Sequence, residues 1–180
     1  MGNVRVLAAD SMGVRSLATV VEACGLVIGI DLGASLAPRR YGLPPHEVEL
    51  RRLEYALNLA RLAIAESDVL VITHYHYDHY IRFEPELYYG KKLLVKHPKQ
   101  EINASQRMRA WRFLVKDKVE DKADVAYADG REFRVGDVVI RFSQPVWHGD
   151  IGSRVGKVLM VKVTTCDGET LAYTSDVQGP

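Results

Sequence analysis

The stretch Val69-Leu70-Val71-Ile72-Thr73-His74-Tyr75-His76-Tyr77-Asp78-His79 decides how the rest of the chain is interpreted. It begins with an apolar run that is typical of a buried strand. Directly after the run come three of the six histidines of the chain, together with one carboxylate. We predict that this segment holds a metal site at the end of a strand.

The spacing of the polar residues supports this prediction. Residues two apart in an extended segment point the same way, so His74 and His76 can reach one cation. Asp78 and His79 lie beyond the strand end and can reach a second cation. Imidazole and carboxylate groups suit zinc, iron or manganese, and this segment contains no cysteine for a thiolate site. The alternative, three unrelated histidines in a surface loop, does not explain the preceding strand pattern.

At these residues the sequence resembles the metallo-β-lactamase-fold hydrolases. Within them it looks most like an archaeal group of the UPF0282 type, which shares the signatures Trp147-His148-Gly149 and Ser175-Asp176-Val177-Gln178-Gly179-Pro180. The resemblance implies an α/β fold, the αββα sandwich. This chain would form mainly the N-terminal half of that sandwich, a mixed β-sheet with covering helices.

The resemblance also implies a site for two divalent cations, zinc by preference and iron or manganese otherwise. The first cation would be bound by His74, His76 and His148, and the second by Asp78, His79 and Asp176. In the family the carboxylate in the place of Asp176 bridges both cations. Asp78 would in addition be the catalytic residue that orients the attacking hydroxide.

Three of these roles have simpler alternatives. Asp31, in Asp31-Leu32-Gly33, would support the metal-binding loops from behind, but it could equally be a turn residue that bonds to its own backbone. His148 could be a buried structural histidine. Asp176 could be a turn-forming aspartate.

Length and composition predict one domain over residues 1–180. The chain has 180 residues, of which 47% are hydrophobic, and this is enough for one sizeable core. No apolar run of about 18 residues and no signal-peptide pattern is present, so we expect no membrane association and a cytoplasmic location. Cys24 and Cys166 lie far apart among apolar neighbours, which predicts free, buried thiols in a reducing compartment.

The remaining elements follow from hydrophobic periodicity. Leu53, Leu57, Ala60 and Ile64 recur at helical spacing and predict a helix over 46–66 that covers one face of a sheet. Residues 68–73 fit a centre strand. Further strands are expected at 4–8, 17–23, 26–30, 131–135, 138–142, 157–164 and 170–173, the first three as a meander and the last two as a hairpin.

The middle of the chain is basic. Residues 91–118 hold nine lysines and arginines but only two acidic residues, an excess of seven positive charges. A solvated surface is one interpretation. The other is that this region flanks the metal site and attracts a phosphate-bearing substrate or a nucleic acid. Gln106, Arg107 and Arg109 are the expected contacts, because the run 103–107 looks like part of the family pattern.

In the family a last histidine of the second metal lies beyond the point where this chain ends. We therefore expect a C-terminally incomplete domain. It would be a truncated chain, a half completed by a partner chain, or a shortened domain with one metal. Each alternative predicts an exposed apolar sheet face toward the missing half.

The resemblance implies a hydrolase that uses a metal-activated water. The bond cleaved could be a phosphoester, a thioester or a lactam-like amide, and the basic region favours phosphate. The alternative is a non-catalytic metal-binding or nucleic-acid-binding module, or an inactive fragment of a hydrolase.

Overall fold

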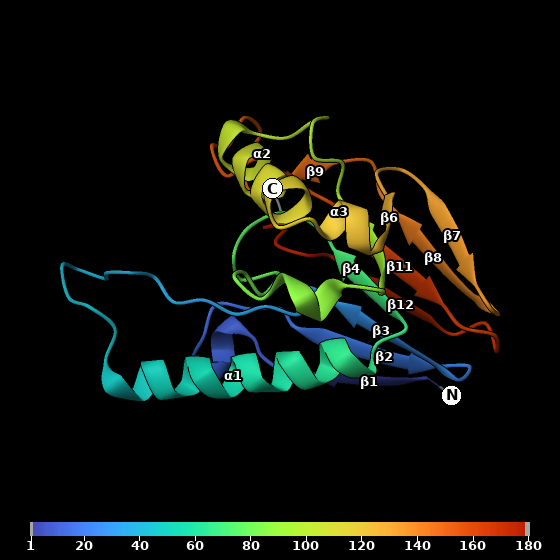
Figure 1. Cartoon of the computed structure of the whole chain (residues 1–180), viewed down its shortest axis with the longest axis horizontal. Helices are drawn as coiled ribbons and strands as arrows, with labels where there is room; N and C mark the ends of the chain where they lie inside the picture. Colours follow the sequence, from blue (N-terminus) through green and yellow to red (C-terminus); the bar gives the residue numbers. More distant parts are fainter. Residues whose placement is uncertain (1, 179–180) are drawn as a thin grey trace.

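A six-stranded mixed sheet forms the middle layer of the structure, a computed structural model that describes residues 2–178 (Figure 1). Its strands lie in chain order: β1 (Asn3–Val6), β2 (Thr19–Ala23), β3 (Leu26–Ile30), β4 (Val69–Ile72), β5 (Lys92–Val95) and β6 (Asp124–Tyr127). The first three strands pair antiparallel, which confirms the predicted meander. From β3 to β6 the pairing is parallel. Strand β4 is buried at all four positions, as expected for a centre strand.

A four-stranded antiparallel sheet packs against the first one. Its order is β12 (Thr170–Tyr173), β11 (Val161–Thr164), β8 (Val138–Phe142) and β7 (Glu132–Val135), and a short pair, β9 (Val146–Trp147) and β10 (Lys157–Val158), lies beside it. The predicted hairpin β11–β12 is confirmed, and β7 and β8 pair as a second hairpin. The turn at Asp129-Gly130 carries the chain from one sheet to the other, because β6 and β7 belong to different sheets.

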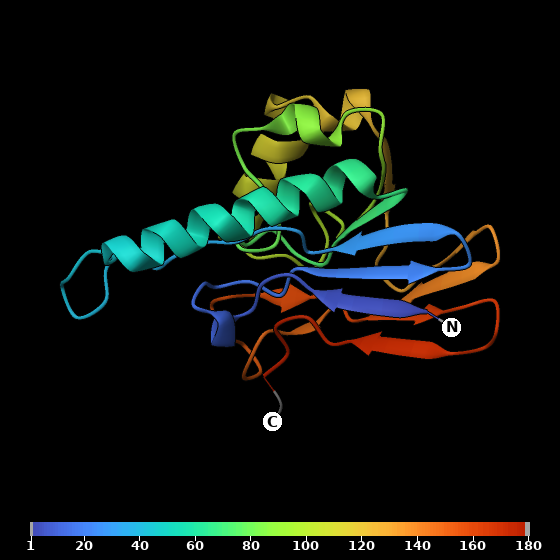
Figure 2. The same cartoon turned by 90° about the horizontal axis from the view of Figure 1, so that it is seen from below.

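Two apolar clusters hold these layers together. Between the sheets, Ile28, Val71 and Leu94 of the first sheet belong to the same buried cluster as Ile140 and Val161 of the second. The opposite face of the first sheet packs against the helices, so the described residues form three layers, as Figure 2 shows. Each of the fully buried aliphatic side chains contributes about 1.5–3 kcal/mol relative to exposure.

The helical layer consists mainly of α1 (Glu47–Glu66), which confirms the helix predicted at 46–66. His46 caps it: its Nδ1 accepts from Val48 N at 3.2 Å, while Glu49 accepts from the His46 N–H at 2.7 Å. The smaller elements are η1 (Asp10–Met12), η2 (Pro85–Tyr88), α2 (Ala104–Trp111), the π-helix η3 (Arg112–Lys116) and α3 (Val119–Lys122). None of the helices within residues 2–178 has the length and apolar composition that a bilayer crossing requires.

Within residues 2–178, part of the expected exposed apolar sheet face is found at one edge of the first sheet. Outward positions of the second sheet carry Arg141, Lys162 and Ala172 side by side, so this face is mostly polar and the prediction is wrong there. On edge strand β1, Val4 and Val6 are 47% and 55% exposed. A sheet face that carries charged side chains can be exposed to water without a covering layer.

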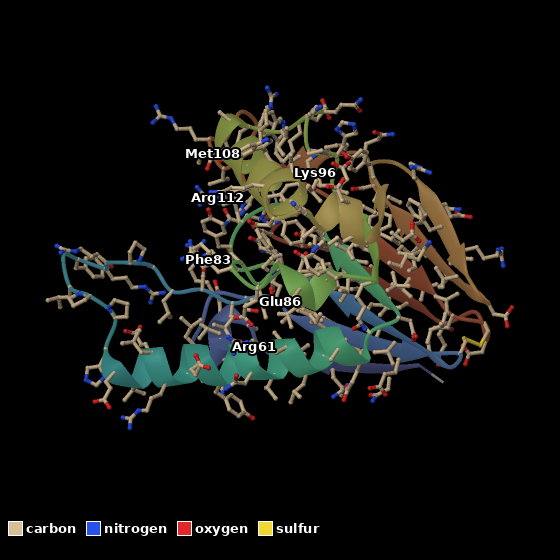
Figure 3. The ribbon with its side chains drawn as sticks, viewed as in Figure 1. Arg61, Phe83, Glu86, Lys96, Met108 and Arg112 are labelled. Atoms are coloured by element: carbon tan, nitrogen blue, oxygen red, sulfur yellow. A yellow bond between two sulfur atoms is a disulfide. The ribbon has the colours of Figure 1, made fainter. Side chains whose placement is uncertain are left out.

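The prediction of free, buried cysteines is wrong. Cys24 and Cys166 are exposed and form a disulfide with a Cα–Cα distance of 6.1 Å (Figure 3). The bond joins the turn between β2 and β3 to the turn between β11 and β12, so it links the two sheets. Two cysteines separated by 142 residues gave no indication of this contact. The disulfide also removes the reason for inferring a reducing compartment.

Replacing Cys24 by serine should lower the free energy of unfolding by about 2–4 kcal/mol, because an unfolded chain without the cross-link has more conformational freedom. Urea denaturation of the wild-type chain and of Cys24→Ser, each with and without reductant, measures this. Reductant should destabilise only the wild type. Equal stability of both proteins in oxidising buffer would show that the cross-link contributes nothing.

Candidate metal centre

The six predicted metal ligands come from three places in the fold. His74, His76, Asp78 and His79 follow β4, while one further residue comes from the short pair β9–β10 and one from the second sheet. His148 follows β9 and Asp176 follows β12. The ring centroid of His76 lies 4.4 Å from that of His74 and 5.2 Å from that of His148. The structure therefore brings all six residues together.

The ligands divide into two sets that share one carboxylate. His74, His76, His148 and Asp176 can direct one atom each to within 4.8 Å of one another, and Asp78, His79 and Asp176 form a second such set. Asp176 Oδ2 lies 3.1 Å from both His79 Nε2 and His148 Nε2. Its position between the two sets suits a carboxylate that faces two cations.

Unpartnered ring nitrogens show that the cluster fits a cation. Within residues 2–178, the buried ring nitrogens His74 Nε2 and His148 Nδ1 have no hydrogen-bond partner. A buried polar atom without a partner is costly, and a metal ion would use the imidazole lone pairs. The set of imidazoles and carboxylates is one that zinc, iron and manganese accept.

Asp31 lies behind the cluster, where the resemblance placed it. Its Oδ2 is 2.9 Å from His79 Nδ1, so the opposite nitrogen, Nε2, faces Asp176. Asp31 also accepts hydrogen bonds from the Thr73 N–H at 2.8 Å, from the Thr73 hydroxyl at 2.6 Å and from the Tyr173 hydroxyl at 2.9 Å. A carboxylate held by three donors can fix the orientation of an imidazole in the way typical of metal-binding histidines.

The two halves of the site are also joined by hydroxyl groups. Thr73 Oγ1 lies 2.7 Å from Ser175 Oγ, which connects the end of β4 to the residue before Asp176. Ser175 has a left-handed backbone, φ 54°, and so turns the chain sharply just before the carboxylate. No local pattern predicts these roles of Thr73, Tyr173 and Ser175, because the partners lie 42 to 142 residues away in the sequence.

The turn Asp31-Leu32-Gly33 requires glycine at its last position. A Cβ atom at Gly33 would lie 2.3 Å from the backbone nitrogen of Tyr80 and 2.8 Å from the carbonyl carbon of His79. Only glycine allows the turn that carries Asp31 to pack so closely against the end of the metal-binding segment.

Charge and burial set the protonation of the cluster. Burial, aided by the neighbouring histidines, lowers the pKa of His76 to about 4 and that of His74 well below its ordinary value. Both imidazoles are therefore neutral at pH 7 and have lone pairs to donate. Burial opposes the charge on His79, but Asp31 and Asp176 outweigh it and raise its pKa to about 10. Burial likewise opposes the charge on Asp176, but the His148 and His79 hydrogen bonds lower its pKa well below its ordinary value.

The chain is similar in sequence to several named proteins, although no family model matches it. A protein named UPF0282 from Aeropyrum pernix is 59% identical over 178 residues, covering 98% of this chain and 60% of the relative. UPF0282 proteins from Korarchaeum cryptofilum and Thermococcus kodakarensis are 49% and 46% identical, covering 97% and 96% of this chain and 57% and 61% of theirs. The chain thus spans about three fifths of the length of these relatives.

Among solved structures, one from Veillonella parvula DSM 2008, described as a possible metal-dependent hydrolase, superimposes with a TM-score of 0.57. It is 13% identical, and the match covers 99% of this chain and 63% of that one. The chain therefore shares its overall fold with that structure. At this identity the likeness concerns the fold alone.

The expected substrate contacts lie in different places. Arg109 lines a cavity beside His76 and Asp78. Gln106 does not reach that cavity, since it is fully buried and its amide donates to the carbonyl of Val155 at 2.8 Å. Arg107 is exposed on another side of α2, near Trp111.

The cavity also contains two arginines that sequence analysis missed. Arg15 reaches it from the loop before β2, and its Nη2 lies 3.8 Å from Asp78 Oδ2. Arg82 follows the metal-binding segment by three residues, and that proximity was the one signal that could have identified it. Arg15 had no comparable signal, because only the folded chain brings its loop to the site.

Proposed function

We propose that this chain is the metal-binding part of a hydrolase that uses a metal-activated water. The observation that carries the proposal is the pair of ligand sets that share Asp176 beside a cavity. We propose zinc as the metal, with iron and manganese as alternatives that the same donors accept. Two cations held there would acidify a water molecule and stabilise the negative charge that forms on the substrate.

The residues of the chain have distinct parts in this proposal. His74, His76 and His148 hold one cation and Asp78 and His79 the other, while Asp176 faces both. Asp78 also lines the cavity and is 6% exposed, so its carboxylate can orient the attacking water. Asp31 is a positioning residue for His79, whose Nδ1 it approaches to 2.9 Å.

Phosphoesters are the substrates we propose. Arg15, Arg82 and Arg109 line the cavity, and guanidinium groups bind phosphate oxygens in a bidentate way. Two lysines of the basic region pair with carboxylates elsewhere: Lys92 with Asp124 at 2.8 Å and Lys96 with Asp129 at 2.8 Å. The proposed attraction of phosphate therefore rests on these arginines rather than on the total charge of residues 91–118.

The test is hydrolysis of bis(p-nitrophenyl) phosphate by the zinc-loaded chain. Turnover should disappear after treatment with a chelator and return when zinc is added back, because in this proposal the metal ions activate the attacking water. Turnover that persists at full rate in excess chelator would rule the proposal out.

A second candidate function is nucleic-acid binding without catalysis. One observation favours it: a groove beside α2 contains Trp111, which is 54% exposed, together with Lys99 and Arg107. An exposed aromatic ring between cations suits stacking of single-stranded bases. Affinity for an oligonucleotide should then fall steeply with salt and survive chelation.

A cytoplasmic location and a partner chain that completes the domain stay predictions.

A further inference from the structure

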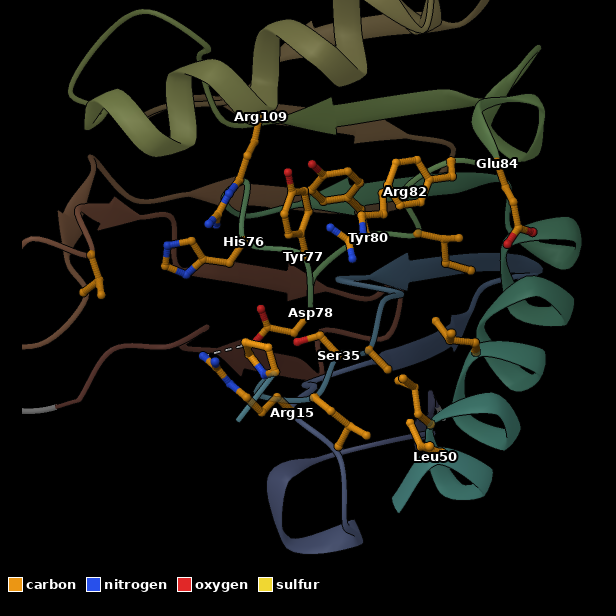
Figure 4. A pocket seen from close by; sticks show the side chains of 18 residues that line it. Arg15, Ser35, Leu50, His76, Tyr77, Asp78, Tyr80, Arg82, Glu84 and Arg109 are labelled. Carbon is orange, nitrogen blue, oxygen red and sulfur yellow. Dashed lines mark ion pairs between the residues drawn. The ribbon is translucent and has the colours of Figure 1, made fainter. Parts of the chain in front are cut away.

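A cavity of about 870 Å³ opens beside the metal centre, with His76 and Asp78 in its wall (Figure 4). This volume is much larger than a phosphate group needs, since sites for whole drug-sized ligands occupy about 300–1,000 Å³. The cavity therefore has room for another part of a substrate besides a phosphate group.

The end of the cavity near the metal centre is positively charged. Figure 4 shows Arg109 pointing from α2 toward His76 and Arg15 pointing toward Asp78. The guanidinium carbons of Arg82 and Arg109 lie 4.3 Å and 4.5 Å from the centre of the Tyr77 ring, which orients both groups. Within residues 2–178, neither of these two arginines has a carboxylate at ion-pair distance, whereas Glu84 in the same wall already pairs with Arg61 at 2.8 Å.

The rest of the cavity is apolar. Leu50, Leu53 and Leu57 project from one side of α1, and Leu36 and Phe83 face the same space from two loops. Leu50 is 50% exposed and Phe83 is 70% exposed, unusual values for large apolar side chains that gather in one cavity. Burial of these surfaces would favour a ligand with an apolar group attached to its anionic group.

We infer that the substrate is a phosphoester with a bulky apolar substituent. The arginines hold the phosphate beside the metal centre, and the leucines of α1 bind the apolar group. This inference rests on the proposed function and names the class of substrate for the same site. Hydrolysis would form a P–O bond to the water oxygen and break the P–O bond to the apolar alcohol. The alcohol leaves with a proton that the water gives up.

Binding of simple probes tests this inference without any turnover. The dissociation constants of methyl phosphate, hexyl phosphate and hexanoate are measured by calorimetry with the zinc-loaded chain. Hexyl phosphate should bind roughly 10–100-fold more tightly than methyl phosphate, because several methylene groups leave water. Hexanoate should bind more weakly than hexyl phosphate, since a carboxylate has fewer oxygens for the arginines.

Two variants and two matched controls assign the effect to residues. Leu53→Ser should remove most of the advantage of hexyl over methyl phosphate, and Arg82→Gln should weaken both phosphates by roughly 10-fold. Two substitutions at exposed positions of α1 should change neither affinity. They are Leu62→Ser, where the residue is 63% exposed, and Arg51→Gln, where the side chain is 70% exposed. Circular dichroism confirms that each variant is folded.

The outcomes separate this inference from the proposed function. Equal affinities for methyl and hexyl phosphate, or an advantage that Leu53→Ser leaves intact, would overturn the inference even if the chain hydrolyses phosphoesters. Hexanoate binding as tight as that of hexyl phosphate would also overturn it. If the probes and the variants bind as expected but the zinc-loaded chain does not hydrolyse bis(p-nitrophenyl) phosphate, the apolar phosphate site stands and the hydrolase proposal fails.

Discussion

The His76→Ala variant is expected to lose the bound metal and to lower phosphoester hydrolysis by roughly 10²–10³-fold or more, the loss found when one electrostatic group is removed from an active site. His76 belongs to the ligand set with His74 and His148, and its low pKa keeps it neutral and able to bind a cation at pH 7. Among the described residues that line the cavity, His76 is the only histidine.

A histidine outside the cluster provides the control. His46 caps α1, and asparagine is an equally good capping residue, so His46→Asn should keep metal content and hydrolysis unchanged. Metal content by elemental analysis and initial rates are measured for the wild type and both variants. An unchanged rate in His76→Ala would contradict the hydrolase proposal.

The second large effect concerns stability rather than chemistry. Lys96 at the end of β5 is fully buried, and its Nζ lies 2.8 Å from Asp129 Oδ1. Burial lowers the pKa of Lys96, and the hydrogen bond to Asp129 opposes that shift. Asp129→Ala would leave a buried ammonium group without its carboxylate, and we expect the free energy of unfolding to fall by about 3–5 kcal/mol.

The measurement is urea denaturation of Asp129→Ala and of the double variant Lys96→Met/Asp129→Leu. The double variant removes both charges and should recover most of the lost stability, because an apolar pair of similar size can replace a buried ion pair. A loss below about 1 kcal/mol in Asp129→Ala would show that water solvates Lys96 in solution, as at an exposed ion pair.

The same lysine shows why part of the fold escaped prediction. The basic region 91–118 was read for its charge, so strand β5 at Lys92–Val95 went unrecognised. Lys96 is buried only because Asp129, 33 residues later, reaches it. A partner at that distance leaves no local pattern. By contrast, β4 and the helix over 46–66 were predicted from periodicities that lie within each segment.

The candidate site divides in the same way. Four of the proposed ligands lie in one short segment, where their spacing alone predicts a metal site, whereas the prediction of His148 and Asp176 depends on the resemblance to a known family. Gln106, expected to contact substrate, instead links α2 to the loop before β10 through Val155. That role depends on the packing of two segments that are far apart in the sequence, and no local pattern predicts it.

The central claim is that six residues, Asp176 among them, form two cation sites. The most direct test is the zinc content per chain, measured by elemental analysis after dialysis of the wild type, His79→Ala and His76→Ala. The account predicts two zinc ions per wild-type chain, one for each ligand set, and a loss of zinc in each variant. A wild-type chain without bound zinc, or variants that retain the full amount, would contradict it.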